Sequence, residues 1–516
     1  MAKDYRMEFL PDLDEFRETT IQFHNGELTV AQYKGFSGGF GSYAQRGGKK
    51  HMFRLRMAGG RVTKERLKFI TDVCQKYSVD RLKITTCQSI QLHNLAPCDL
   101  FEIMEAAWNA GMVSRGGGGD FPRNVMASPL SGVDATEYFD VMPYAEAAGE
   151  YLMGFIKSVK FPRKLKVCFS GSPANETHAT FRDLGFVANH DHTFDVYAAG
   201  GLGIKPSLGV CVASAIPPAK TLYYIKAMVN TFLTYGNYEN RGKARTRFMQ
   251  ETLGREGLFK AYQEKLEEAF ATECLDLAVH VPAITKKGTG QAAPDRRLIP
   301  QKQDGLYAVF YQPPGGNLLP AKAAQLYETI KNMEDVEIRL TPDEGLYLIN
   351  CNAEEAAKLL EVTQDGSKTL FETSVACIGA GICQVGIGDS QSLLSACLEA
   401  VRKENFADGV LPQIHISGCP SSCGTHQIGA LGFRGGIRQT ADGPKPAFAI
   451  FEGGCPFQGK ENLADTGKPI LANDIPQFLV ELGQMISADN SSYEPWIAKH
   501  HGKLEALIAK YTRELL

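Results

Sequence analysis

Four cysteines in the last third of the chain have neighbours and a spacing that could bind iron and sulfur. Cys377 and Cys383 stand in the segment ACIGAGICQVGIGDS, and Cys419 and Cys423 stand in SGCPSSCG. The pattern is C-x5-C, then thirty-five residues, then C-x3-C. Four thiolates on two glycine-rich loops suit an iron–sulfur cluster. Small residues beside the ligands let backbone N–H groups approach the sulfurs and tune the potential.

Three other interpretations of these cysteines compete with the cluster. Zinc sites usually show short C-x2-C pairs, and neither spacing here matches. A radical enzyme that uses S-adenosylmethionine would need three cysteines in one C-x3-C-x2-C loop, but position 426 is His426. The third interpretation is four buried cysteines in glycine-rich turns, which suits any single cysteine better than it suits the quartet. The remaining cysteines are scattered and are expected to pack as small apolar side chains.

An internal repeat predicts the elements that position these loops. Residues 51–112 read as strand, helix, strand, strand and helix, and residues 306–364 repeat that order. The strands are predicted from alternation and β-branched content, and the helices from apolar residues at three- and four-residue steps. Each block is therefore expected to be an α+β unit with an antiparallel hairpin.

A second match follows the first in both halves of the chain. Ser170–Phe186 aligns with Ser417–Phe433 without a gap, and serine, glycine, proline, leucine and phenylalanine agree at several positions. In this alignment Ser172 and Glu176 stand where the second half has the last two cysteines of the quartet. Only the second half can therefore supply thiolates at these positions.

The two matches predict an α+β fold that is internally duplicated, with two small and two larger domains. A chain of 516 residues is also too long for one hydrophobic core. The glycine-rich first fifty residues are expected to form an extended arm with few helices. The predicted parts are the N-terminal arm (1–50), a small domain (51–115), a larger domain (116–282), a linker (283–304), a second small domain (305–368) and a second larger domain (369–516).

Composition and charge narrow the class of protein. The net charge of -3 gives no overall attraction to nucleic acid or to membranes. The N-terminus MAKDYRMEFLPDLDEF has charges where a signal peptide needs an apolar core. No apolar run is long enough to span a bilayer. We therefore expect a soluble, cytoplasmic protein with neither a nucleic-acid nor a membrane partner.

The cysteine pattern, with SGCPSSCG around its second part, resembles the siroheme-dependent sulfite and nitrite reductases. The resemblance extends over nearly the whole chain from about residue 35. It implies two ferredoxin-like small domains and two larger domains that bind siroheme and a [4Fe-4S] cluster. It also implies that Cys423 ligates both the cluster and the siroheme iron. A shared sulfur would couple the cluster directly to the iron at which six electrons are needed.

Motifs in the first half carry the same resemblance. Arg54 begins an R-x-R-x-x-G-G motif, Arg123 begins R-N-V, and Lys164 and Lys166 end P-R-K-x-K. In the family these residues hold a small oxyanion over the siroheme iron. Arginine offers a fixed fork of donors, so the two arginines are expected mainly to bind the anion. The lysines are expected mainly to deliver protons. The leucine between each basic pair should face the core.

The resemblance also implies a set of residues that contact the siroheme carboxylates. Thr85–His93 matches the family's T-x-R-Q-x-x-Q-x-H, except that Cys87 stands where arginine is usual. This departure concerns one macrocycle contact and not the cofactor itself. For His93 a core histidine with satisfied hydrogen bonds is the alternative. The residues implied to bind siroheme are Lys83, Gln91, His93, Arg163 and Cys423.

The leading functional hypothesis is the six-electron reduction of sulfite to sulfide. Lys166 favours sulfite, because nitrite-reducing relatives commonly carry asparagine there; reduction of nitrite to ammonia by the same site is the alternative. An electron-transfer protein without turnover is a second alternative, which would need no anion pocket.

Gly38–Gly48 lacks the strand and helix of a nucleotide loop. Electrons are therefore expected from a separate protein, by resemblance a ferredoxin or a flavoprotein.

Overall fold

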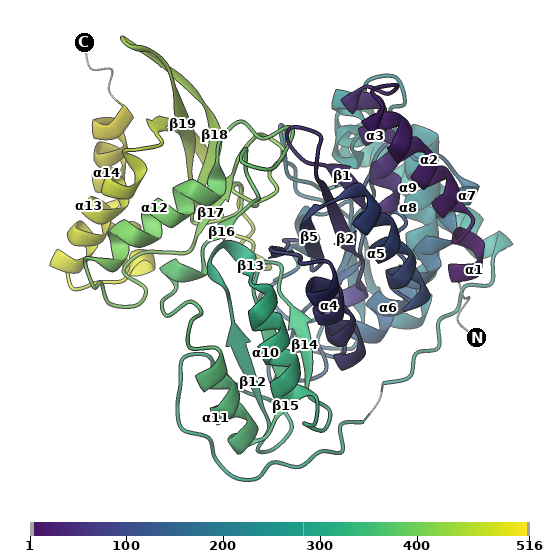
Figure 1. Cartoon of the computed structure of the whole chain (residues 1–516), viewed down its shortest axis with the longest axis horizontal. Coiled ribbons are helices and arrows are strands. Elements are labelled where there is room, and N and C mark those ends of the chain that lie inside the picture. The colour runs from purple at the N-terminus through teal and green to yellow at the C-terminus, as the bar shows by residue number, and fades with distance from the viewer. Residues whose placement is uncertain (1–4, 282, 513–516) are drawn as a thin grey trace. The chain divides into compact units, whose positions relative to one another are not determined.

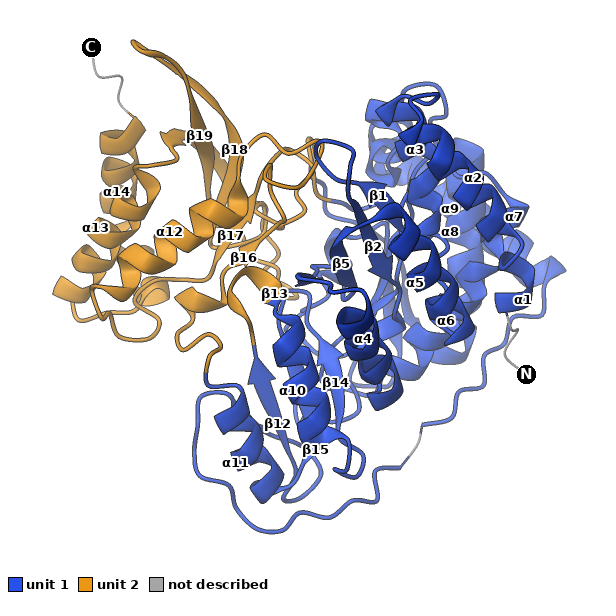
Figure 2. Cartoon of the chain, viewed as in Figure 1, with its two compact units in different colours: residues 1–201, 206–311, 318–364 blue, residues 202–205, 312–317, 365–516 orange. Residues whose placement is uncertain are grey.

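The computed structural model describes residues 5–281 and 283–512, which form two compact units (Figure 2). Unit 1 comprises residues 1–201, 206–311 and 318–364, and unit 2 comprises residues 202–205, 312–317 and 365–516. The described residues contain four five-stranded sheets with helices packed against them (Figure 1). The predicted α+β class is therefore confirmed.

Unit 1 contains both predicted small domains, and each has the expected order of elements. Their sheets have the orders β1-β2-β5-β4-β13 and β11-β12-β15-β14-β3. The first consists of β1 (Ser42–Ala44), β2 (His51–Leu55), α4 (Lys64–Lys76), β4 (Leu82–Ile84), β5 (Ile90–Leu95) and α5 (Pro97–Asn109). The second consists of β11 (Leu298–Pro300), β12 (Tyr307–Tyr311), β13 (Asn317–Leu318), α10 (Pro320–Ile330), β14 (Glu337–Leu340), β15 (Leu346–Cys351) and α11 (Ala353–Val362).

The two small domains share a sheet edge and a core. The short strand β3 (Arg61–Val62) leaves the first domain and pairs antiparallel with β14 of the second. Buried side chains of both domains, such as Leu82 and Leu348, belong to one hydrophobic cluster. A half-domain of this size buries little apolar surface alone, so pairing the two copies makes one adequate core. Sequence periodicity predicted the elements but not this exchange.

The two larger domains repeat one sheet, with three parallel strands followed by two antiparallel ones. Phe169 pairs with Phe186 in the first copy, and Ile416 pairs with Phe433 in the second, so the register is the same. The first sheet contains β6 (Met126–Ala127), β7 (Val167–Ser170), β8 (Leu184–Ala188), β9 (Phe194–Ala198) and β10 (Val210–Ile216). The second contains β16 (Val375–Ala376), β17 (Ile414–Ser417), β18 (Leu431–Thr440), β19 (Gly443–Glu452) and β20 (Asp465–Leu471).

A matched pair of glycines shows why the duplicated loops need these residues. A Cβ on Gly185 would lie 2.0 Å from the carbonyl oxygen of Ala179, and a Cβ on Gly432 would lie 2.0 Å from that of His426. The loop after each central strand therefore presses on the next strand in the same way. Helices pack against these sheets, and the side chains between them form hydrophobic clusters. The helices are α6 (Met142–Met153), α7 (Phe155–Ser158), α8 (Thr221–Tyr235) and α9 (Met249–Thr272) in unit 1, and α12 (Ser390–Arg402), α13 (Ile475–Ala488) and α14 (Tyr493–Thr512) in unit 2.

The prediction of an extended N-terminal arm with few helices was wrong. The segment forms α1 (Arg6–Phe9), α2 (Asp12–His24) and α3 (Val30–Ser37). Phe16 is buried in the core of the small domains, and Thr29 starts α3 with a capping box. The glycines that suggested a loop have another use. A Cβ on Gly118 would lie 2.5 Å from the carbonyl oxygen of Gly38, so two backbones meet there.

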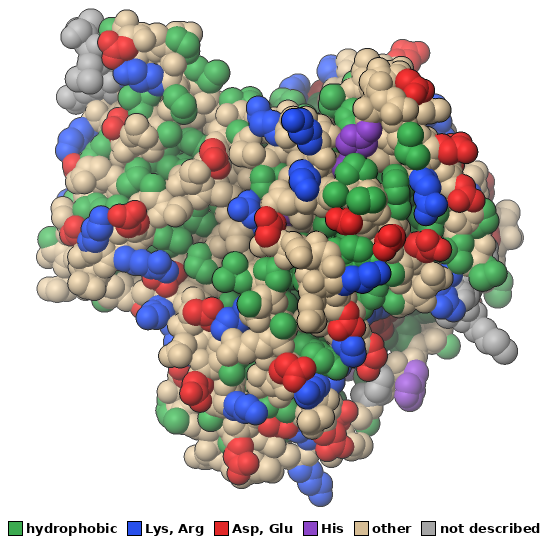
Figure 3. Space-filling view, in the orientation of Figure 1, with side chains coloured by type: hydrophobic (Ala, Val, Ile, Leu, Met, Phe, Trp, Pro, Cys, Tyr) green, Lys and Arg blue, Asp and Glu red, His purple; other side chains and the backbone are tan. Residues whose placement is uncertain are grey.

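Residues 283–297, within the predicted linker, contain no helix or strand. The second small domain begins earlier than predicted, because β11 already pairs with β12. No described helix is both long and apolar enough to cross a membrane. On the face drawn in Figure 3, acidic and basic side chains are interspersed. The cations that matter for the site are the buried ones.

Candidate active site

Two predicted anion-binding arginines converge on one glycine-rich loop in unit 1. Arg54 is the next-to-last residue of β2 and is half-buried. Its Nη1 donates to the carbonyl oxygen of Gly117 at 2.5 Å. Arg123 donates from Nη1 to the same oxygen at 3.1 Å and from Nη2 to that of Gly119 at 2.8 Å. Leu55, next to Arg54, is fully buried as predicted. The loop thus holds both guanidinium groups side by side.

Backbone pairing joins Arg123 to the two predicted lysines. The amide of Arg123 donates to the carbonyl oxygen of Leu165 at 2.8 Å, and the amide of Leu165 donates to that of Phe121 at 3.2 Å. Leu165 is fully buried, as expected for the residue between Lys164 and Lys166. The two lysines therefore flank a core residue beside Arg123. Arg123 and the two lysines, which are far apart in the sequence and predicted to act together, therefore lie on hydrogen-bonded backbone segments.

Lys166 is held at both ends. Its amide donates to Oδ2 of Asp183 at 2.8 Å, and its Nζ donates to Sγ of Cys87 at 3.2 Å. Burial lowers the pKa of Lys166, the nearby thiol of Cys87 acts against this shift, and Arg182 and Arg245 add to it. A lysine with a lowered pKa gives up its proton more readily than a solvated one.

Several further basic residues complete this cluster, and sequence reasoning gave them no role. Arg56 donates to the carbonyl oxygens of Arg115, Pro122 and Arg123 at 3.0–3.1 Å, so it fixes the loop that carries Arg123. Arg245 donates to both oxygens of the buried Asp183 at 3.0–3.1 Å. The signal for Arg245 was its segment NRGKARTRF, which resembles the family but does not reveal the distant aspartate.

Unpaired donors in the cluster indicate a missing anion. The Nε atoms of Arg123 and Arg245 are buried and have no hydrogen-bond partner among the residues that the structure describes. Buried donors are normally satisfied, and an unsatisfied one costs free energy. A carboxylate-rich macrocycle or a small oxyanion would supply the acceptors. The residues present therefore fit siroheme and an anionic substrate.

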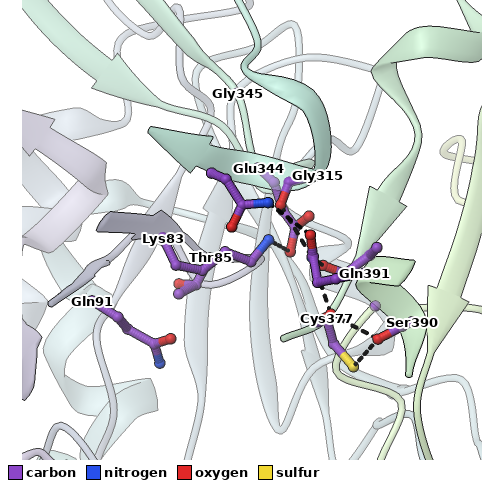
Figure 4. A network of polar contacts seen from close by, with 12 residues as sticks. Lys83, Thr85, Gln91, Gly315, Glu344, Gly345, Cys377, Ser390 and Gln391 are labelled. Atoms are coloured by element: carbon purple, nitrogen blue, oxygen red, sulfur yellow. Dashed lines mark hydrogen bonds and ion pairs between the residues drawn. The ribbon is translucent and has the colours of Figure 1, made fainter. Parts of the chain in front are cut away.

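The residues predicted to contact siroheme have partners of their own in unit 1. Lys83 and Glu344 form a buried ion pair of 2.6 Å (Figure 4). Arg163 pairs with Asp120 at 2.6 Å. These carboxylates already balance two of the predicted charges, so the siroheme contacts of Lys83 and Arg163 remain predictions.

Gln91 joins His93 to Arg54, one of the two arginines predicted to bind the anion. His93 lies 3.2 Å from Gln45 through Nδ1, and burial with Arg81, Lys83 and Arg54 nearby lowers its pKa to about 3. It is therefore neutral, as the core-histidine alternative requires. With its amide oxygen turned toward Arg54, Gln91 accepts from Nε of that arginine at 3.0 Å and donates to His93 at 3.2 Å.

In unit 2 the first cysteine of the quartet lies in a network of polar contacts (Figure 4). The amide of Gly418 donates to Sγ of Cys377 at 3.2 Å, and Oγ of Ser390 lies 3.2 Å from the same sulfur. Gln391 donates to the carbonyl oxygen of Cys377 at 3.1 Å and accepts from Asn317 at 2.7 Å. N–H···S bonds of this kind are what cluster-binding thiolates receive in proteins.

The two cysteine loops interleave through their glycines. A Cβ on Gly418 would lie 2.5 Å from the carbonyl oxygen of Gly388, so the loop of Cys419 sits against the loop of Cys383. Burial raises the pKa of Cys377 to about 12, and the next contribution comes from Cys423 on the other loop. The glycines are thus what lets two loops far apart in sequence bring thiols together.

The four cysteines stay the predicted ligands of an iron–sulfur cluster. Among the residues that the structure describes, no three His, Cys, Asp or Glu side chains gather closely enough to hold one metal ion. A four-iron cluster needs a wider arrangement, because each of its four thiolates binds a different iron.

In the first half, Glu176 takes the place of Cys423. Burial with Asp134 and Asp343 nearby raises the pKa of Glu176 to about 7.

Comparison with known families agrees with this geometry. Residues 118–270 match the model of the nitrite and sulphite reductase 4Fe-4S domain. Residues 43–107 and 299–365 match the nitrite/sulfite reductase ferredoxin-like half domain. Together these matches cover more than half of the chain. The two small domains are therefore ferredoxin-like half-domains.

Individual relatives span most of the chain. The chloroplastic ferredoxin–nitrite reductase of Zea mays is 26% identical over 455 residues, covering 84% of this chain and 78% of the relative. The ferredoxin–nitrite reductase of Synechococcus elongatus is 28% identical over 409 residues, covering 75% and 76%. Sulfite reductase [ferredoxin] 1 of Mycolicibacterium paratuberculosis is 23% identical over 422 residues, covering 79% and 74%.

A solved structure shares the fold. The NirA protein of Mycobacterium tuberculosis superimposes with a TM-score of 0.75 at 20% sequence identity, covering 95% of this chain and 96% of that one. The two small domains and the buried cationic cluster lie within the segments that the family models match, and the thiol loops at residues 377–423 lie outside those segments. The chain belongs to the nitrite and sulfite reductase family and uses that family's siroheme and [4Fe-4S] cluster.

Proposed function

We propose that this protein reduces sulfite to sulfide, with Cys377, Cys383, Cys419 and Cys423 as the cluster ligands and Cys423 also on the siroheme iron. The siroheme and the cluster supply electrons to the bound anion. The electrons come from an external donor protein. A ferredoxin is the favoured donor, because the relatives from Zea mays and Synechococcus elongatus are named ferredoxin–nitrite reductases.

The observation that carries the proposal is the joining of Arg123 to the Lys164–Lys166 segment by backbone hydrogen bonds. Arg54 and Arg123 bind the anion, since a charged fork gives two strong donors to its oxygens. Lys164 and Lys166 hold protons at Nζ and release them as oxygens leave as water. A protein that only transfers electrons has no need of such a set, which argues against the non-catalytic alternative.

Nitrite is the second candidate substrate. The names of the two ferredoxin–nitrite reductases above favour it. The charge of Lys166, in contrast, favours sulfite as the substrate. Sulfite has three oxygens and carries one or two negative charges around neutral pH, whereas nitrite has two oxygens and one charge. A second lysine beside Lys164 favours the more highly charged anion and adds a proton source for the third oxygen.

Lys166→Asn is expected to lower kcat/KM for sulfite by more than for nitrite. The change removes one charge from a partly screened pocket, so selectivity should shift by about 1–2 kcal/mol, roughly five- to thirtyfold. The measurement is anaerobic kcat/KM for both anions at one ionic strength. Lys49→Asn, which alters an exposed lysine, is the matched control. Equal losses would assign Lys166 to general proton supply, and a larger loss for nitrite would reverse the preferred substrate.

A further inference from the structure

Cys87 stands where the family usually has an arginine, and hydrogen bonds hold the backbone turn that carries it. It lies in the turn between β4 and β5, where the amide of Gln88 donates to the carbonyl oxygen of Thr85 at 3.0 Å. The side chain of Asn124, next to Arg123, donates to the carbonyl oxygen of Cys87 at 3.0 Å. This turn is therefore tied to the segment that carries the anion-binding arginine.

The thiol of Cys87 faces cations. Its Sγ accepts from Nζ of Lys166 at 3.2 Å. Burial alone would raise the pKa of Cys87, but the positive charges around it lower the pKa to about 6. The surrounding cations therefore favour the thiolate form of Cys87. The charged groups that face this pair are Arg54, Arg123, Arg182 and Arg245, with Asp183 on the backbone amide of Lys166.

Replacing arginine by cysteine reverses the electrostatic effect on Lys166. An arginine at position 87 would repel the ammonium and favour its neutral form. A thiolate there attracts the ammonium and favours the charged form. In this chain Sγ of Cys87 lies 3.2 Å from Nζ of Lys166, at a site where burial already disfavours the ammonium.

We propose that Cys87 is a positioning residue that keeps Lys166 protonated and aimed within the anion pocket. The inference rests on the proposed function and deepens it, since Lys166 can act as a proton source only while it carries the proton. The alternative is that Cys87 only packs as a small apolar side chain against Met126 and Cys168. That role would not depend on charge.

The pH window follows from the two groups. The thiolate forms as pH rises through about 6, so the attraction is present above that value. Function is lost as pH rises further through the pKa of Lys166, and the thiolate moves this loss to higher pH. Removing the negative charge should therefore shift the alkaline limb, the fall in activity and in anion affinity at high pH, toward lower pH.

The test uses two changes in the holoenzyme, Cys87→Ser and Cys87→Asp. Serine keeps the size but not the charge, and aspartate keeps a negative charge. Nitrite is the probe, because it stays a monoanion across the range whereas sulfite changes protonation. Two quantities are measured from about pH 6 to about pH 10: kcat/KM for nitrite, and the affinity of the oxidised holoenzyme for nitrite by calorimetry. Cys98→Ser, an exposed cysteine, is the control.

The expected result is an alkaline limb about one pH unit lower in Cys87→Ser than in the wild type, in both quantities. Cys87→Asp should restore it toward the wild-type position, and Cys98→Ser should leave it unchanged. In Lys166→Arg the side chain stays protonated, so the limb in nitrite affinity should vanish and an added Cys87→Ser should have no further effect. The comparison of Lys166→Arg with the wild type needs no Cys87 variant, so it still tests whether Lys166 is the titrating group if the Cys87 variants lose cofactor.

Superimposed profiles for the wild type and Cys87→Ser would overturn the inference, as would an aspartate variant that behaves like serine. A surviving limb in Lys166→Arg would overturn it too, because Lys166 would not be the titrating group. These outcomes differ from failure of the proposed function. Wild-type protein that reduces neither anion would contradict the function, whereas the affinity profile would still report on the pair of Cys87 and Lys166.

Discussion

Replacing Cys377 by alanine should remove the [4Fe-4S] cluster and unfold much of unit 2. The iron content should fall by about four per chain, because each cysteine of the quartet binds one iron and the cluster needs all of them. Metal binding contributes directly to folding free energy, so the interleaved loops should lose their order with the cluster. Iron analysis and the midpoint of thermal unfolding of anaerobically purified protein measure both effects.

Matched variants separate ligands from structural cysteines. Cys383→Ala and Cys419→Ala should give the same loss as Cys377→Ala. Cys274→Ala should retain iron and stability, because that cysteine is exposed and lies in unit 1, outside the quartet. If Cys274→Ala and Cys377→Ala purified with equal iron, the quartet would not be the ligand set.

Arg123→Ala should weaken oxyanion binding by about ten- to a hundredfold. A charge-assisted hydrogen bond contributes roughly 1.5–3 kcal/mol, and the guanidinium of Arg123 is predicted to make one to the anion. Part of the loss will come from the loop, since the same guanidinium holds the carbonyl oxygens of Gly117 and Gly119. The measurement is the apparent affinity for sulfite and for nitrite, with the cofactor spectrum as a check of loading.

Two controls sharpen the result for Arg123. Arg123→Lys keeps the charge but not the fork, so its affinity should lie between those of the wild type and the alanine variant. Arg255→Ala changes an exposed arginine on α9 and should bind both anions normally. Unaltered affinity in Arg123→Ala would place this arginine outside the pocket.

Periodicity and repeats predicted the duplicated fold well, because they depend on local patterns. The two β-α-β-β-α blocks have the predicted order, and the gapless alignment of the larger domains is an identical strand register. Leu55 and Leu165 are buried as strand alternation requires. The N-terminal helices were missed, because glycines outweighed the short apolar pattern of α2 and the capping box at Thr29.

The site was predictable only in part, because its electrostatics depend on contacts between distant residues. Motifs singled out Arg54, Arg123 and the lysine pair. No local pattern shows that Glu344 neutralises Lys83, or that Asp183 binds Arg245 and the amide of Lys166. Cys87 was visible as a departure from the family motif, and only the folded structure shows the ammonium beside it.

The most direct test of the account is turnover by protein purified without oxygen and with siroheme available. The account predicts about five irons per chain, four in the cluster and one in siroheme, and an isobacteriochlorin absorption band. With a reduced artificial donor, sulfite should be converted to sulfide with six electrons consumed per anion, and kcat/KM for sulfite should exceed that for nitrite. A preparation that holds only zinc, or a fully loaded one that reduces neither anion, would contradict the account.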